Sequence, residues 1–138
     1  MARNRFPAPQ VERLPLSDAD WIELKRDLTV GEEKDISLLA MRELSQADGA
    51  VKFTMDYQLL PFAKAVIYLV GWSFHNAKGP VKLDDDQRKR LSQLRALDRE
   101  TWEEIDAAIQ RHEENVAAQK KSSIGTSGTE TSSPSAAP

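Results

Sequence analysis

The chain has 138 residues, enough for one domain with a single hydrophobic core. Its 19 basic and 22 acidic side chains leave a net charge of −3, which excludes bulk electrostatic attraction to nucleic acid as the basis of its function. The absence of cysteine excludes disulfides, thiol nucleophiles and thiolate-bound zinc. Residues 1–10 lack the apolar core of a signal peptide, so we expect a soluble intracellular protein.

The N-terminal part predicts an extended arm followed by a β-hairpin. Residues 1–10 contain two prolines and form the predicted arm. In residues 21–25, WIELK, apolar and charged side chains alternate with the period of a half-buried strand. Residues 11–16 fit its partner strand, residues 17–20 fit the turn, and Pro15 would confine the first strand to a sheet edge. Two strands alone are marginal in water, so this hairpin must pack on helices.

A capping-box pattern, Thr29 with Glu32, predicts the start of the first helix. We expect this helix to continue to about Gln46 and to end at Asp48-Gly49. Its buried stripe is expected at Ile36, Leu39, Ala40 and Leu44. Residues 51–55 alternate weakly and fit either a short strand or an extended linker.

The most apolar stretch is residues 59–72, LLPFAKAVIYLVGW, in which Lys64 is the only charged residue. It is shorter than the roughly 20 residues that a membrane-spanning helix needs, so we predict a core helix. Pro61 suits the first turn of that helix, where a missing N–H costs nothing. Apolar residues cover most of its circumference, so the helix should be buried on more than one side until Gly71 breaks the pattern.

Two shorter helices and a tail are predicted to follow a turn at residues 76–80. The acidic residues 84–86 indicate the start of one helix, and Asp98 should cap the last helix, which we expect to fray near Gln119. The inner face of that last helix is predicted at Trp102, Ile105, Ala108, Ile109 and His112.

Residues 118–138 are rich in Ser, Thr, Gly and Pro, and we predict that they are disordered because they cannot bury enough apolar surface. The predicted fold class is therefore mainly α. It consists of an extended arm at 1–10, a small helical domain at 11–117 with an N-terminal β-hairpin, and a disordered C-terminal tail.

The chain contains no pattern typical of an enzyme, a cofactor site or a metal site, and we expect none of the three. His75 and His112 lie far apart in sequence, so His75 is predicted to be an ordinary surface histidine. Residues 84–86 lack the alternating ligands and closing glutamate of a calcium loop. Residues 88–90, Arg-Lys-Arg, are predicted to form a solvated helix face rather than a phosphate site.

Aromatic and apolar side chains near the core helix are the candidate partner-binding residues. As core residues they need no further explanation, but if they are partly exposed they would form a patch for a protein partner. The candidate set consists of Phe62, Val66, Trp72, Phe74 and Trp102.

Three segments together resemble the tail assembly chaperones of long-tailed, siphovirus-type bacteriophages. The first, VERLPLSDADWIELKRDLTVGEEKDI, joins a Leu-Pro strand, an acidic turn, a Trp-containing strand and a helix start. The second, AVIYLVGWSF with NAKGPVKL, is an apolar helix that leads into a Trp-Ser pair and a Gly-Pro turn. The third is the final amphipathic helix in LRALDRETWEEIDAAIQRHEE. The resemblance covers about residues 11–116.

The resemblance implies a role in assembly rather than a chemistry. Such chaperones bind the long helical tape measure protein, keep it soluble and help tail tube subunits polymerise around it. In many of them a longer, frameshifted form contacts the tail tube protein. For this chain the resemblance implies these two partners, no membrane partner, location in the cytoplasm of an infected bacterium, and absence from the mature virion.

Two other functions stay open at this stage. A structural subunit of the tail or head–tail connector would assemble into rings or tubes by itself. A small nucleic-acid-binding regulator would use residues 88–99, and its binding would weaken steeply with salt.

Overall fold

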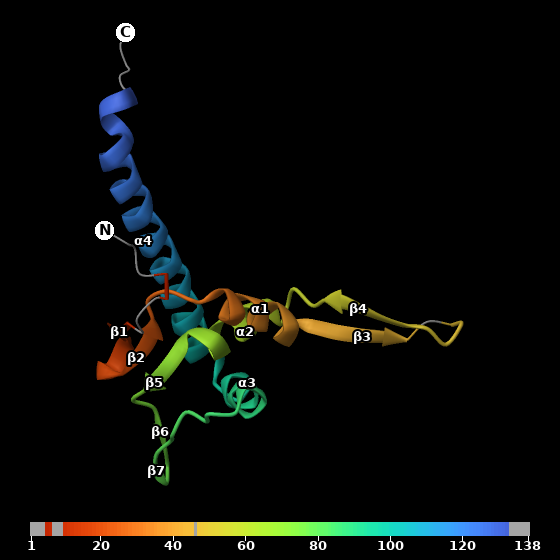
Figure 1. The fold of residues 1–138 in the computed structure, drawn as a ribbon. Helices are drawn as coiled ribbons and strands as arrows, with labels where there is room; N and C mark the ends of the chain where they lie inside the picture. Colours follow the sequence, from red (N-terminus) through yellow and green to blue (C-terminus); the bar gives the residue numbers. More distant parts are fainter. Residues whose placement is uncertain (1–4, 7–9, 46, 133–138) are drawn as a thin grey trace.

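The computed structural model describes residues 5–6, 10–45 and 47–132 of the chain (Figure 1). The predicted N-terminal arm lies mostly outside these residues. The elements in chain order are β1 (Val11–Pro15), the 3₁₀ turn η1 (Ser17–Ala19), β2 (Trp21–Lys25), α1 (Val30–Leu39), β3 (Met41–Ser45), β4 (Val51–Met55), α2 (Leu60–Tyr68), β5 (Leu69–Trp72), β6 (His75–Asn76), β7 (Gly79–Pro80), α3 (Gln87–Arg95) and α4 (Arg99–Ser132).

The architecture is mixed α/β, so the mainly helical prediction is wrong. Two strands occupy segments that the sequence assigned to helices. β3 lies where the first helix was expected to continue, and β5 takes the last four residues of the predicted core helix. Both segments pair with other strands. Such pairing commonly overrides the weak local preferences on which single-sequence prediction rests.

The predicted N-terminal hairpin is confirmed and gains a third strand. β1 pairs antiparallel with β2, and β2 pairs with β5, giving the order β1-β2-β5 with Pro15 on an edge strand. The central strand carries Ile22 and Leu24, which are both fully buried. On the other side of the hairpin, the guanidinium of Arg13 lies 3.7 Å from the ring centroid of Trp21. The hairpin therefore contributes two core side chains and keeps its polar side outward.

The capping box that begins α1 is confirmed. The Glu32 N–H donates to Thr29 Oγ1 at 3.2 Å, and the Thr29 N–H donates to Glu32 Oε1 at 2.9 Å. Burial alone would raise the pKa of Glu32, but hydrogen bonds from Lys25 and Thr29 outweigh it and hold that pKa below its usual value. The helix ends at Leu39 rather than near Gln46, because the chain turns into β3 at Met41.

The core is built around α2, which is confirmed as a buried helix although it is shorter than predicted. Pro61 lies in its first turn, and four consecutive residues, 65–68, are buried, so several sides of the helix are covered. It packs against α1, α3 and α4. The same cluster contains Ile22 and Leu24 from β2, Leu69 from β5, Leu94 from α3, and Ile105 and Ile109 from α4.

Arg90 of α3 binds the carboxyl end of α2. Its Nη1 donates to the carbonyls of Val66 and Leu69 at 2.9 and 2.6 Å, and its Nε donates to the carbonyl of Asp84 at 2.8 Å. Burial lowers the pKa of the guanidinium, although Asp85 and Asp84 oppose this. The prediction that residues 88–90 form a solvated face is therefore wrong for Arg90, which is half-buried, whereas Arg88 and Lys89 are exposed.

The last helix, α4, follows its predicted cap. Asp98 accepts from the Thr101 N–H at 3.2 Å and from its hydroxyl at 2.6 Å, and these bonds lower the pKa of Asp98. The predicted inner face is confirmed, with Ile105, Ala108, Ile109 and His112 buried and Trp102 half-buried.

The end of α4 differs from the prediction, because the helix passes Gln119 and continues to Ser132. The hydrogen bonds of an α-helix are internal to it, so the helix can extend beyond the core without a further partner. The disorder predicted for residues 118–138 stays a prediction, and residues 133–138 lie outside the described part of the chain.

We predict that Arg90→Met lowers the free energy of unfolding by about 2–3 kcal/mol, because it leaves the carbonyls of Val66 and Leu69 without their charged donor. Arg88→Met on the same helix is the matched control, since Arg88 is exposed and its loss should cost no more than about 0.5 kcal/mol. Urea unfolding followed by circular dichroism measures both values. Equal losses in the two variants would show that Arg90 contributes nothing through its contact with α2.

Candidate protein-interaction surface

A two-stranded hairpin extends from the body of the molecule, and we call residues 41–55 the β3–β4 arm (Figure 1). Its register pairs Met41 with Met55, Glu43 with Phe53 and Ser45 with Val51. Residues directly opposite each other on paired strands lie on one face of the sheet. One face of the arm therefore carries the apolar side chains of β4, with Met41 beside them at the root and Glu43 opposite Phe53.

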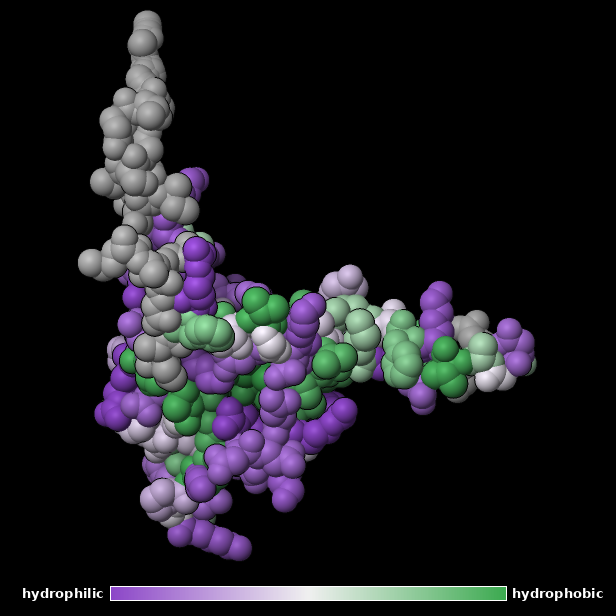
Figure 2. Space-filling model, in the orientation of Figure 1, coloured by the Kyte–Doolittle hydropathy of each residue, from purple (hydrophilic) through white to green (hydrophobic). Residues whose placement is uncertain are grey.

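Most apolar side chains of the arm are exposed to solvent, whereas Met55 at its root is half-buried against the core. Phe53 is 62% exposed and Val51 is 55% exposed, and Met41 and Leu44 are exposed as well. Figure 2 shows that the surface of the arm alternates between hydrophobic and hydrophilic patches. A lone hairpin is marginally stable in water, and grouped exposed apolar residues mark interaction surfaces. The arm is therefore the strongest candidate for a protein-binding site on this chain.

Sequence reasoning missed the arm, although one signal for it was present. An Asp-Gly pair between two alternating stretches is a strong local indication of a hairpin, and Asp48-Gly49 stands between residues 41–45 and 51–55. The turn is formed locally: Gly49 has a φ of 87°, and Asp48 Oδ1 accepts from the Ala50 N–H at 3.0 Å. The pair was interpreted as the end of a helix because the capping box upstream favoured one.

The five predicted partner-binding residues fall into two ring pairs and one core position. Phe62 and Trp102 stack with centroids 4.1 Å apart, and Trp72 and Phe74 lie 4.9 Å apart. The four rings are half-buried and pack against the core, whereas Val66 is 1% exposed and lies inside it. A partner can therefore reach the rings only at their exposed edges, and their role in binding stays a prediction.

The Phe62–Trp102 pair borders an open depression of about 470 Å³ between α2, α3 and α4. Leu94 and Leu97 add apolar lining. The remaining lining residues are charged and of both signs, namely Arg95, Arg99, Glu103 and Asp106. The depression is a second apolar surface with a charged rim.

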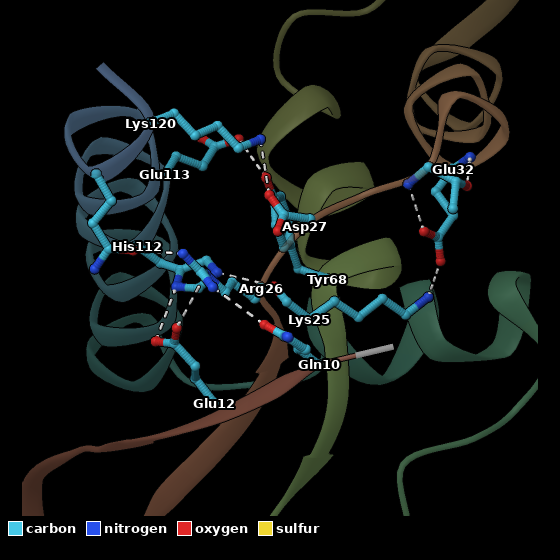
Figure 3. Close-up of polar contacts among 12 residues, drawn as sticks. Gln10, Glu12, Lys25, Arg26, Asp27, Glu32, Tyr68, His112, Glu113 and Lys120 are labelled. Carbon is cyan, nitrogen blue, oxygen red and sulfur yellow. Dashed lines mark hydrogen bonds and ion pairs between the residues drawn. The ribbon is translucent and has the colours of Figure 1, made fainter. Parts of the chain in front are cut away.

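Several of the polar contacts in Figure 3, those of His112, Glu113 and Lys120, hold α4 against the rest of the molecule. His112 is buried, and its Nε2 donates to the carbonyl of Lys25 at 2.9 Å, since a carbonyl can only accept. Glu113 accepts from Lys64 at 3.0 Å and from the Tyr68 hydroxyl at 3.1 Å. Burial, together with the charge of Glu113, raises the pKa of Tyr68. These contacts attach one helix to β2 and α2 at once.

This polar cluster has the composition of a structural contact. Lys120 forms a 2.8 Å ion pair with Asp27, and Arg26 Nη2 donates to Gln119 Oε1 at 2.8 Å. Throughout the described ranges, no three His, Cys, Asp or Glu side chains are arranged to hold a metal ion. His75, the other histidine, is exposed on β6. The cluster therefore fixes the position of α4, and its side chains also line an open pocket of about 240 Å³ beside that helix.

Comparison with known proteins gives no match: no family model fits the chain, and no curated protein or solved structure is significantly similar to it. Among the residues that the structure describes, none of the helices has the length and hydropathy needed to cross a membrane.

We predict that Phe53→Ser changes the free energy of unfolding by no more than about 0.5 kcal/mol, because the side chain is mostly solvent-exposed and lies outside the core. The contrasting variant Val66→Ser should lose about 2–4 kcal/mol, because it places a hydroxyl in the buried cluster and removes methyl groups from it. Chemical denaturation compares the two. A large loss for Phe53→Ser would mean that the arm supports the fold and is not free to bind a partner.

Proposed function

We propose that this chain is a phage tail assembly chaperone, which binds the tape measure protein, keeps it soluble and promotes polymerisation of the tail tube around it. The proposal combines the sequence resemblance over about residues 11–116 with one structural observation, the exposed apolar face of the β3–β4 arm. The protein would act in the infected cell and leave before the virion is complete.

The arm provides an exposed apolar surface, which binding of a tape measure protein requires. A tape measure protein exposes long apolar helical stripes before assembly, and these need a cover that can later be removed. The row formed by Met41, Val51 and Phe53 can lie against such a stripe, and Lys52 and Arg42 on the other face stay in water. A narrow contact of this kind is weak on its own, so several chaperones along one client would bind reversibly.

A structural subunit of the tail or head–tail connector is the second candidate. The unpaired strand edges of the arm favour it, because projecting hairpins can join neighbouring subunits by strand pairing. The two functions differ in the location of the protein after assembly. A structural subunit remains in purified particles, whereas a chaperone is absent from them.

The test is co-expression with the tape measure protein of the same phage, scored by the soluble and copurifying fraction of that protein. We expect the wild-type chain to keep its client soluble, and Phe53→Lys to reduce the copurified fraction about tenfold or more, because a charge in an apolar contact costs at least about 1.4 kcal/mol. The lysine would face Glu43 across the arm, so the strand pair itself is not opposed by like charges. Val30→Lys is the matched control, since Val30 is similarly exposed but lies on α1 outside the arm.

Each outcome has a defined meaning. If the client stays soluble with both variants, a surface other than the arm binds it, and the half-buried rings Trp72 and Phe74 are the next positions to change. If the client is insoluble even with the wild-type chain, the chaperone function is wrong. Detection of the chain in purified particles would support the structural subunit instead.

A further inference from the structure

The outer edge of β4 is available for strand pairing. The arm is a two-stranded sheet in which β4 has β3 on one side. The Asp56 N–H donates to the Ala40 carbonyl at 2.7 Å, one position beyond the ladder that pairs Met41 with Met55. Inward and outward groups alternate along an antiparallel strand, so the backbone groups of Val51, Phe53 and Met55 point away from β3.

The same three residues form the apolar row of β4. Their backbone N–H and C=O groups face the open edge, and their side chains share one face of the sheet. An exposed edge that is both apolar and hydrogen-bond competent is a template for another strand. The remaining question is which strand fits it.

We propose that this edge binds the same edge of a second copy of this chain, so that two arms form a four-stranded antiparallel sheet in the order β3-β4-β4-β3. A two-fold axis at Phe53 is the register that pairs all five residues of both strands. It places Phe53 opposite Phe53 of the other copy, Val51 opposite Met55, and Lys52 opposite Thr54. No like charges meet, and each of the three outward-facing residues pairs its N–H and C=O with the other strand.

The other edge of the arm, the outer edge of β3, is poorly suited to pair with the same edge of a second copy. The register that pairs all five residues of β3 has Glu43 at its centre and would place two carboxylates directly opposite each other. Like charges at opposed positions destabilise a strand pair. Pairing through β4 therefore favours a closed dimer over continued growth through β3.

The antiparallel arrangement also brings each tip to the root of the other arm. In the register centred on Phe53, Gly49 of one copy lies opposite the position of Tyr57 in the other. Tyr57 is 76% exposed and is the second residue after the end of β4. The two bodies stand at opposite ends of the shared sheet, so they do not compete for the same space. The contact would bury the root residues that the monomer leaves exposed.

The dimer does not depend on the proposed function, although it would serve it. Pairing joins the apolar rows of two arms on one continuous face, which doubles the width available to a helical client. Self-association and client binding are also measured separately. Loss of one without the other distinguishes failure of the dimer from failure of the chaperone function.

The first experiment is sedimentation equilibrium of the full chain across a concentration series reaching a few hundred micromolar, because an interface of this size is expected to be weak. We expect a monomer–dimer equilibrium. Phe53→Lys should raise the dissociation constant about 30-fold or more, because it places two ammonium groups at the centre of the interface, whereas within each arm the lysine faces Glu43. Val30→Lys, which adds the same charge outside the arm, should leave the constant unchanged.

The second experiment tests the register by cross-linking, which is straightforward because the chain contains no native cysteine. With a short bismaleimide, Phe53→Cys should form covalent dimers with itself. Val51→Cys and Met55→Cys should each cross-link poorly alone but efficiently when mixed, because these two positions face each other only across the pair.

Three outcomes would overturn the proposal. One is a chain that stays monomeric throughout the concentration series. Another is a dimer whose dissociation constant is insensitive to Phe53→Lys while circular dichroism shows that the variant is folded. The third is efficient cross-linking of Val51→Cys with itself, which would indicate a parallel or shifted contact.

Discussion

The structure depends on the burial of α2 and on the hydrogen bonds that the carbonyl groups at its carboxyl end accept. A helix that is apolar around most of its surface must be covered on several sides, and β2, α1, α3 and α4 all contribute to that cover. A buried helix end leaves carbonyl groups without partners unless side chains reach them. Arg90 supplies the donors for Val66 and Leu69, which lets the chain leave the helix and continue as β5, whose first residue, Leu69, is buried in the core.

The position of β5 then determines the rest of the body. Its pairing with β2 places Ile22 and Leu24 against α2, and α4 closes the remaining side with Ile105 and Ile109. The polar contacts of Glu113 and His112 fix the rotation of α4, because each satisfies a partner on a different element. The body is therefore complete without the β3–β4 arm, whose apolar residues add little to its core.

The separation of the arm from the core connects the fold to both the proposed client binding and the proposed dimer. The arm is a projecting hairpin with an open strand edge, and folding of the core does not require its exposed apolar side chains. Binding of another protein chain accounts for their exposure. The exposed row can cover an apolar helical client, and the outward backbone groups of the same residues can pair with another strand. The two uses employ different parts of β4, its face and its edge, so one arm can engage both a client and a second copy.

Local chemistry in the sequence determined the starts of the elements and the identity of the core. The capping box at Thr29, the Asp98 cap, the alternation in residues 21–25 and the apolar stretch around Val66 each specify structure through neighbours a few residues away. The ends of α1 and α2, and therefore the fold class, were decided by strand pairing, with the nearby residues 51–55 after α1 and with the distant strand β2 after α2. Residues 41–45 became a strand because residues 51–55 pair with them, and residues 69–72 did so because β2 lies alongside.

The candidate interaction surface also has features that the sequence determined and features that only packing determined. Sequence identified the aromatic residues, but only packing decided that Val66 is enclosed and that the four rings are half-buried in two pairs. The arm was decided by tertiary structure alone, although Asp48-Gly49 signalled its turn. Whether an apolar residue such as Phe53 faces a core or water depends on which elements reach it. That is set by the path of the whole chain and not by the residues beside it.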